Sequence, residues 1–361
     1  MQKITERDNF HKILNMKTYA FPGIIDQNIL NIGAQQIPYM RTSEFSKINK
    51  DSEKLLLDFI HCTEGRTIIY TGSGTGAMAA VVEDYVKTKQ KAYIIDGGSF
   101  GHRWSQLCDY YGCNHIDMNL EFGHDIDYKM LECQISKERP DVFLCQHHET
   151  SSGQLYDLKK ISTICHKYNV SIVVDVISSF LAEELNMDEL DLDICITSTQ
   201  KGLNIPPGLS ILFFSKKLNN YNFAHNGYYW DFENNFCNLK RGQTPYSPAT
   251  VIYLQLNERL HQIQELGLET VISEVKERSA YFRKLCNYYK WNIPADNPSA
   301  AITGFTVNNN GDKVFRSMID KYNTFIMPSF RPNFFRVNHM GIQNHEDLEL
   351  LAKQIHSIEL E

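Results

Sequence analysis

Short apolar runs alternate with helix-like stretches from about residue 55 to residue 215. The apolar runs cover residues 67–70, 92–95, 142–145, 171–174, 193–196 and 209–214. Helical patterns fall between most of them, for example over residues 103–111 and 158–168. Near-continuous apolar runs joined by helices are typical of parallel strands that are buried on both faces. We therefore predict an α/β fold with a mainly parallel sheet sandwiched by helices.

The pattern also predicts where the main domain ends. Only residues 201–208 connect the last two apolar runs, which predicts a hairpin and one antiparallel strand. After Pro248 a long amphipathic helix begins near Ala249, and candidate strands follow at 301–307 and 333–338. We predict an N-terminal arm over 1–20, a large domain over 21–250 and a smaller α+β domain over 251–361.

Two ionisable residues stand at the ends of neighbouring runs. Asp175 ends the run 170–174, and Lys201 comes shortly after the run 193–196. Ligands of open α/β sheets bind outside the carboxyl ends of the strands, so both side chains are expected at one crevice. A lysine that attaches covalently to pyridoxal phosphate, with an acid that keeps the pyridinium protonated, is the minimum apparatus for that cofactor. Taken singly, each has an ordinary explanation as a solvated lysine or a helix-capping aspartate.

A glycine-rich segment supplies a candidate phosphate site. The strand-like run Arg66–Tyr70 leads into Gly72-Ser73-Gly74-Thr75-Gly76 and then a helical pattern. Such a segment lets backbone N–H groups and a helix N-terminus approach an anion. A nicotinamide site is the alternative, because Asp96 lies about where a ribose-binding acid would fall. That reading leaves Lys201 and Asp175 without a role, and a simple turn of small residues is a third reading.

Composition narrows the classes of function. The chain has 361 residues, of which 42% are hydrophobic, and a net charge of −7 without a basic stripe, which argues against nucleic-acid binding. No apolar run is long enough to span a membrane, and the first residues do not resemble a signal peptide. Nine scattered cysteines without a CxxC pair suit a reducing, cytoplasmic compartment. The pair His147-His148 points to opposite faces of an extended segment, so we expect no metal site.

Six motifs, in order along the chain, resemble the class V, fold-type I aminotransferases that depend on pyridoxal phosphate. The likeness is greatest to alanine–glyoxylate (serine–pyruvate) aminotransferases and 2-aminoethylphosphonate–pyruvate transaminases, and it extends from about Met40 to Gly341. The motifs are Ser73-Gly74-Thr75, Gly98-Ser99-Phe100-Gly101-His102-Arg103, His148-Glu149-Thr150-Ser151-Ser152-Gly153, Asp175 with Gln200-Lys201, Thr244-Pro245-Tyr246-Ser247-Pro248 and Phe335-Arg336-Val337.

The resemblance implies a role for each motif. Ser73, Gly74, Thr75 and Gln200 would hold the cofactor phosphate, and Thr244 and Ser247 belong to a segment that reaches the phosphate of a neighbouring subunit. Phe100 would stack on the cofactor ring, with Trp104 as the rival, and Thr150 would bond its phenolic oxygen. Asp175 would pair with the pyridinium, and Lys201 would carry the cofactor. Arg336 would bind the substrate α-carboxylate, with Arg331 as the rival, while His148 and Glu149 would shape their loop.

The implied activity is amino-group transfer between a small amino acid and a 2-oxo acid of the pyruvate or glyoxylate type, in a homodimer. A 2-aminoethylphosphonate–pyruvate transaminase is the nearest alternative. A cysteine desulfurase would need a cysteine on a late loop, and none follows Cys286. A non-catalytic cofactor-binding module would not need the lysine, acid and arginine together. The sequence departs from the family at a substrate-contacting loop, which we match to Asn31–Gln36 and which leaves the substrate open.

Overall fold

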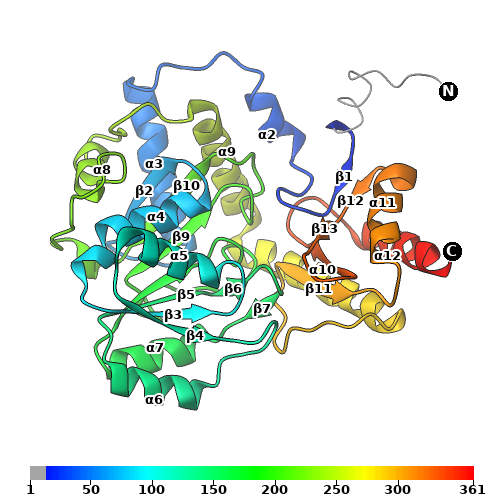
Figure 1. Cartoon of the computed structure of the whole chain (residues 1–361). Helices are drawn as coiled ribbons and strands as arrows, with labels where there is room; N and C mark the ends of the chain where they lie inside the picture. Colours follow the sequence, from blue (N-terminus) through cyan, green and yellow to red (C-terminus); the bar gives the residue numbers. More distant parts are fainter. Residues whose placement is uncertain (1–13) are drawn as a thin grey trace.

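The computed structural model describes residues 14–361; residues 1–13 of the predicted arm lie outside the described residues (Figure 1). A seven-stranded sheet with helices on both faces makes up one part of the molecule, and a three-stranded sheet with α11 and α12 makes up the other. The strands are β1 Lys17–Thr18, β2 Arg66–Thr71, β3 Ala92–Asp96, β4 His115–Asn119, β5 Val142–Gln146, β6 His148–Glu149, β7 Gln154–Leu155, β8 Ser171–Asp175, β9 Ile194–Ser198, β10 Leu209–Phe214, β11 Ile302–Thr306, β12 Thr324–Phe325, β13 Met327–Pro328 and β14 Phe334–Asn338.

The helices occupy most of the segments between these strands. They are α2 Gln27–Ile32, α3 Ser43–Phe59, α4 Gly74–Asp84, α5 Gly101–Tyr111, α6 Tyr128–Glu138, α7 Leu158–Lys167, α8 Phe232–Leu239, α9 Thr250–Leu266, α10 Leu268–Tyr288, α11 Gly311–Tyr322 and α12 His345–Leu360, with short 3₁₀ turns at Val86–Thr88 and Lys216–Leu218.

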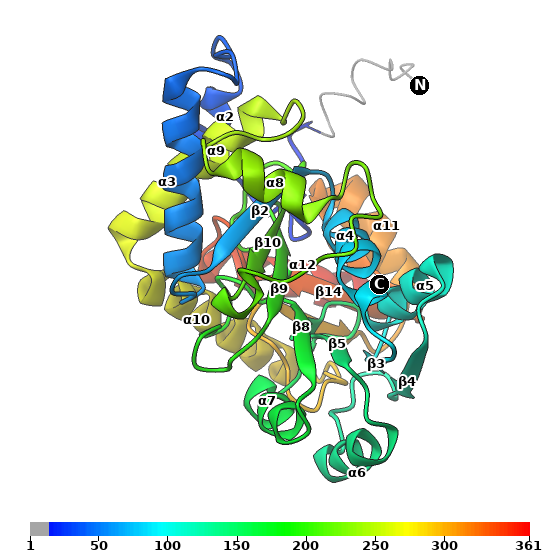
Figure 2. The same ribbon diagram turned by 90° about the vertical axis from the view of Figure 1, so that its left-hand side faces the viewer.

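The large sheet has the strand order β2-β10-β9-β8-β5-β3-β4 (Figure 2). Its strands run parallel except β10, which is antiparallel to both β9 and β2. The predicted mainly parallel sheet and the predicted hairpin are therefore confirmed. All six apolar runs form strands because their side chains are buried on both faces of the sheet.

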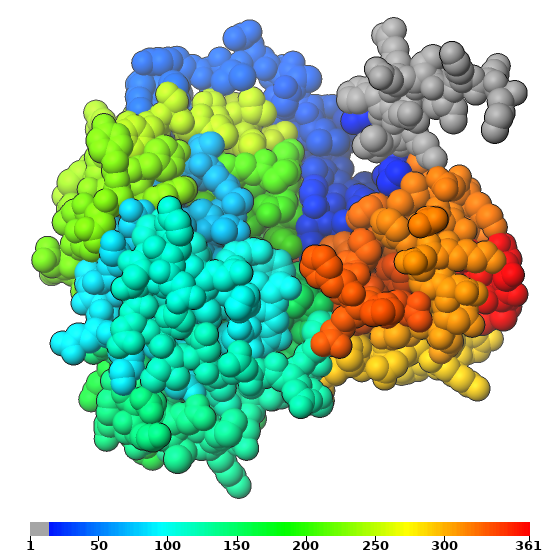
Figure 3. All heavy atoms as spheres, viewed as in Figure 1, coloured from blue at the N-terminus to red at the C-terminus, as the bar shows by residue number. Residues whose placement is uncertain are grey.

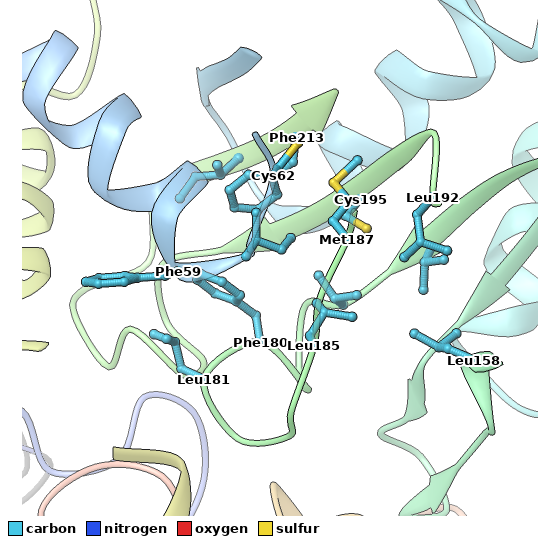
Figure 4. Close-up of a cluster of buried hydrophobic side chains, with 14 of the residues drawn as sticks. Phe59, Cys62, Leu158, Phe180, Leu181, Leu185, Met187, Leu192, Cys195 and Phe213 are labelled. Carbon is cyan, nitrogen blue, oxygen red and sulfur yellow. The ribbon is translucent and has the colours of Figure 1, made fainter. Parts of the chain in front are cut away.

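Successive side chains of each strand enter opposite cores, as the period of a strand requires. In β5, Phe143 and Cys145 join the core under α3, α6, α7 and α9, whereas Val142 and Leu144 join the core under α4, α5 and α8. Figure 4 shows part of the first core, where Phe59 of α3 lies near Phe180 and Leu181. The two cores hold the sheet rigidly, so the loops at its edge start from fixed positions.

The second, smaller sheet has the order β11-β14-β13; it packs against α10 and shares a hydrophobic core with α12. Both strands predicted here are present, as β11 and β14. Residues 17–18 are also ordered, because β1 pairs in parallel with β12. The segment after β1 then runs between the two parts of the molecule (Figure 3). Asn204 donates to the carbonyl of Ile24 and Asn338 donates to that of Ala20, so both parts hold this segment.

Candidate active site

The carboxyl-terminal edge of the large sheet brings the predicted residues together. Asp175 is the last residue of β8, and Lys201 lies three residues after the end of β9. Thr150 lies just beyond the short strand β6, which comes directly after β5. Phe100 lies in the loop after β3, and Ser73 lies in the loop after β2. Because β2, β3, β5, β8 and β9 point the same way, their ends meet at one edge of the sheet.

Lys201 is almost completely buried, with 9% of its surface exposed. Its Nζ atom lies 3.4 Å from the centre of the Phe21 ring, which provides a cation–π contact when the amine is charged. The pKa of Lys201 is lowered to about 7, mainly by burial and also by the positive charge of Arg336, while Asp175 opposes the shift. The residue is therefore a free amine for much of the time near neutral pH, which nucleophilic attack on an aldehyde requires.

Asp175 is the acid expected beside a pyridinium nitrogen. Its Oδ1 accepts a hydrogen bond from the backbone N–H of Ile177 at 2.8 Å, which fixes the carboxylate. The pKa of Asp175 is raised to about 7, mainly by burial and also by the charge of Glu149. The hydrogen bond from Ile177 and the positive charges of Lys201 and Arg103 act in the opposite direction. A buried carboxylate of this kind is strongly stabilised by a cation placed against it, so the residue fits a protonated ring nitrogen.

The glycine-rich segment forms the N-terminus of α4, which begins at Gly74. Ser73 is the N-cap residue, yet its hydroxyl makes no capping bond and is exposed. A Cβ atom on Gly74 would lie 2.4 Å from Cδ1 of Ile177, so any larger residue here would require the side chain of Ile177, two residues after Asp175, to move. Arg103 donates to Oγ1 of Thr75 at 3.2 Å and adds positive charge. The segment fits an anionic group such as a phosphate.

Thr150 and Arg336 are joined directly. Arg336, in β14, donates through Nη1 to the carbonyl of Thr150 at 3.1 Å and through Nη2 to that of Pro328 at 2.9 Å. Its Nε is buried without a partner among the described residues. The hydroxyl of Thr150 shares a 2.7 Å hydrogen bond with Ser178. Arg331, the rival carboxylate ligand, is exposed and stacks on Phe122, with 3.9 Å between its Cζ and the ring centre.

Glu149 organises the loop that carries Phe100. Its buried carboxylate accepts hydrogen bonds from the backbone of Phe100, Gly101 and Ser151 and from the side chain of Gln146. Phe100 is half-buried, with the guanidinium of Arg103 5.0 Å from its ring centre. Trp104 is fully buried in the core under α4 and α5. Of the two aromatic residues, only Phe100 has a ring that is partly exposed and can stack on a ligand.

The remaining predicted residues lie at the margin of the site. Gln200 is half-buried directly before Lys201, and Ser247 is exposed. Thr244 donates to the carbonyl of Tyr246 at 2.7 Å, so its hydroxyl is used within its own loop. Arg41 anchors this loop by donating to the carbonyls of Thr244 and Pro245. The structure of one chain therefore leaves the roles of Thr244 and Ser247 as predictions.

Sequence reasoning missed Phe21. The loop expected to contact the substrate, Asn31–Gln36, lies at the end of α2, where Gly33 approaches Gln255 of α9. The residue in contact with Lys201 is instead Phe21, in the Phe21-Pro22-Gly23 turn. That Pro-Gly turn is the signal that could have indicated a loop at this point.

Two other features lie apart from this chemistry. Oδ2 of Asp96, the acid of the nicotinamide alternative, is 2.8 Å from Nδ1 of His102. A cavity of about 900 Å³ is lined by the start of α7, the segment 180–190 and α10, with His147, Phe180, Leu185 and Ile272 among its residues, and none of the predicted site residues line it. We place the site by the side-chain chemistry at the sheet edge rather than by the size of this cavity. In residues 14–361, no helix is long and apolar enough to cross a membrane.

Comparison with known proteins identifies the family. The family model for class V aminotransferases matches residues 35–326. An uncharacterized aminotransferase of Methanocaldococcus jannaschii is 28% identical, over 91% of this chain and 88% of its own length. The serine–glyoxylate aminotransferase of Hyphomicrobium methylovorum is 26% identical, over 86% of this chain and 81% of its own. The crystal structure of an alanine–glyoxylate aminotransferase from Nostoc sp. shares the fold, with a TM-score of 0.88, 19% identity and 95% of each chain covered.

These matches confirm the resemblance seen in the sequence and exclude a nicotinamide dehydrogenase, because the family model spans the glycine-rich loop, Asp175 and Lys201 together. The chain belongs to the class V aminotransferases, enzymes of fold type I that depend on pyridoxal phosphate.

Proposed function

We propose that this protein exchanges an amino group between a small amino acid and a 2-oxo acid of the pyruvate or glyoxylate type, by a ping-pong mechanism. The observation that carries the proposal is Lys201, a buried amine with a pKa of about 7 whose charge is coupled to Asp175 and Arg336, at the same sheet edge as the glycine-rich start of α4. A relative of similar length acts on serine and glyoxylate, which supports substrates of this size.

Each predicted site residue would have a separate role in the reaction. Pyridoxal phosphate, when bound, takes up the electron pair released at the substrate α-carbon. Lys201 would hold the cofactor at rest and, once freed by the incoming amine, would move the proton of the α-carbon. Asp175 would keep the ring nitrogen protonated, Phe100 would stack on the ring, and Arg336 would bind the substrate carboxylate.

We further propose a cytoplasmic homodimer. Nine unpaired cysteines support a reducing compartment. The Thr244–Pro248 loop carries Tyr246, which stacks on Tyr228 and Tyr229 at ring distances of 5.7 Å and 5.2 Å. Arg41 joins this loop to the segment that bears the exposed Ile37 and Tyr39. An exposed apolar surface of this kind favours association, and it supports a site shared between two chains.

Borohydride reduction tests the cofactor site directly. The purified protein should be yellow, and reduction should fix the cofactor to the peptide that contains Lys201. Lys201→Ala should lose this label and all amino transfer, whereas the substitution of an exposed lysine of α6, Lys137→Ala, should leave both the label on Lys201 and the activity unchanged. A colourless protein that takes up no added cofactor would contradict the proposal.

A second experiment identifies the amino donor. In single turnovers of the cofactor-loaded protein, a panel of donors compares amino acids with amines that lack an α-carboxylate, such as 2-aminoethylphosphonate.

A further inference from the structure

His148 is buried near the predicted site residues, and its side chain makes no hydrogen bond with any of the residues 14–361. Its side chain has 2% of its surface exposed, and neither ring nitrogen has a hydrogen-bond partner among the described residues. The backbone around it is fixed, because β6 pairs with β7 and the His148 carbonyl accepts a bond from Ser178. Buried polar groups are nearly always paired, so an unpaired imidazole points to a missing partner.

The surroundings of the ring are positively charged. Burial lowers the pKa of His148 far below its ordinary value, and the charges of His147, Lys201, Arg283 and Arg336 act in the same direction. Its ring is therefore neutral, with one N–H donor and one acceptor nitrogen. Arg283 has its own partners in the nearby Glu183 and the carbonyl of Ser299. Within residues 14–361, Arg336 has no such anion bonded to it, and its Nε is also unpaired.

An anion would complete this part of the site. Glu149 is the carboxylate whose charge acts on Arg336, but its oxygens already accept bonds from Gln146 and from the backbone of the Phe100 loop. A cationic ligand would be repelled by Lys201 and Arg336, whereas a carboxylate could accept from a guanidinium and an imidazole N–H together.

We propose that His148 is a specificity residue whose ring N–H donates a hydrogen bond to the substrate carboxylate that Arg336 binds. This inference rests on the proposed function, because that function supplies the carboxylate. It goes beyond the loop-shaping role expected from the sequence, which Glu149 fulfils. His148 would then favour substrates with a carboxylate over amines without one. When an amine without a carboxylate binds, the His148 N–H would stay buried without a hydrogen-bond acceptor, which costs binding free energy.

Binding of propanoate, which has the carboxylate but no amine, tests this without turnover. Calorimetry on the cofactor-loaded protein should show about tenfold weaker binding in His148→Phe, because one hydrogen bond to a charged group is lost. His148→Asn keeps a donor and should retain most of the affinity. His339→Asn is the control, since this histidine is equally buried and, unlike His148, already has one ring nitrogen, Nε2, bonded to Thr303. Cofactor content should be unchanged in each variant.

Three results decide the matter. Unchanged propanoate affinity in His148→Phe, with a lower melting temperature, would overturn the proposal in favour of a purely structural ring. Weaker binding in His148→Phe but not in Arg336→Gln would support His148 while contradicting the proposed arginine clamp. Unchanged affinity in both variants would overturn both assignments. If His148→Phe does not fold, His148→Leu makes the same test with a smaller apolar side chain.

Discussion

At the scale of single residues, burial rather than pairing sets the charges of the site. It is the largest cause of the pKa shifts of both Lys201 and Asp175, which bring the two groups from opposite directions to about 7. The sequence could indicate both residues, because each follows an apolar run. It could not indicate Phe21, whose contact with Lys201 joins residues 180 positions apart (201 − 21). Nor could it show that the ring of His148 has no hydrogen-bond partner within residues 14–361.

The shifted pKa of Lys201 predicts the pH dependence of its reactivity in the cofactor-free protein. A lysine with a pKa of about 7 loses its proton well below the ordinary 10.5, so reductive methylation should rise up to pH 7 and then level off. Mass spectrometry of the Lys201 peptide gives the rate, and exposed Lys137 in the same sample reports the pH dependence of the reagent. Arg336→Gln removes a positive charge and should move the curve to higher pH. A rate that still rises tenfold per unit above pH 9 would contradict the assignment.

At the scale of elements, the sequence indicated every central strand of the large sheet, because those strands are apolar on both faces. It did not indicate β4, an edge strand in which polar and apolar residues alternate: His115-Ile116-Asp117-Met118-Asn119. It placed the loops less well, since their conformations depend on bonds between distant segments. The bonds from the Phe100 loop to Glu149, about 50 residues away, are an example.

Glu149 should therefore stabilise the start of α5 and its loop. In Glu149→Ala, the backbone N–H groups of Phe100 and Gly101 would be buried without an acceptor, and the helix N-terminus would lose its negative charge. We expect a loss of about 2–4 kcal/mol in the free energy of unfolding, measured in urea. Glu44→Ala, at the exposed start of α3, is the matched control and should change stability by less than about 1 kcal/mol. Equal effects of the two substitutions would refute this role.

At the scale of the whole molecule, the site depends on segments that only the complete fold brings together. The segment 20–24 is bonded both to Asn204, near Lys201, and to Asn338, near Arg336. The sequence suggested a large and a small domain, but it gave no sign that one N-terminal segment would connect their functional residues. If Thr244 and Ser247 complete the phosphate site of a second chain, the same dependence extends to the assembly.

The exposed tyrosines give the test of that assembly. Tyr228 has 87% of its surface exposed and stacks on Tyr246 of the Thr244–Pro248 loop. Tyr228→Glu would place a charge in the surface that we propose to be the dimer contact, so sedimentation should show a shift from the proposed dimer toward monomer at micromolar concentration. The monomer should also release its cofactor on dilution, because the partner's contribution to the phosphate site would be missing. Tyr288→Glu changes a tyrosine of comparable exposure (78%) at the end of α10 and should leave both properties unchanged. A Tyr228→Glu monomer that keeps its cofactor would show that each chain holds the phosphate alone.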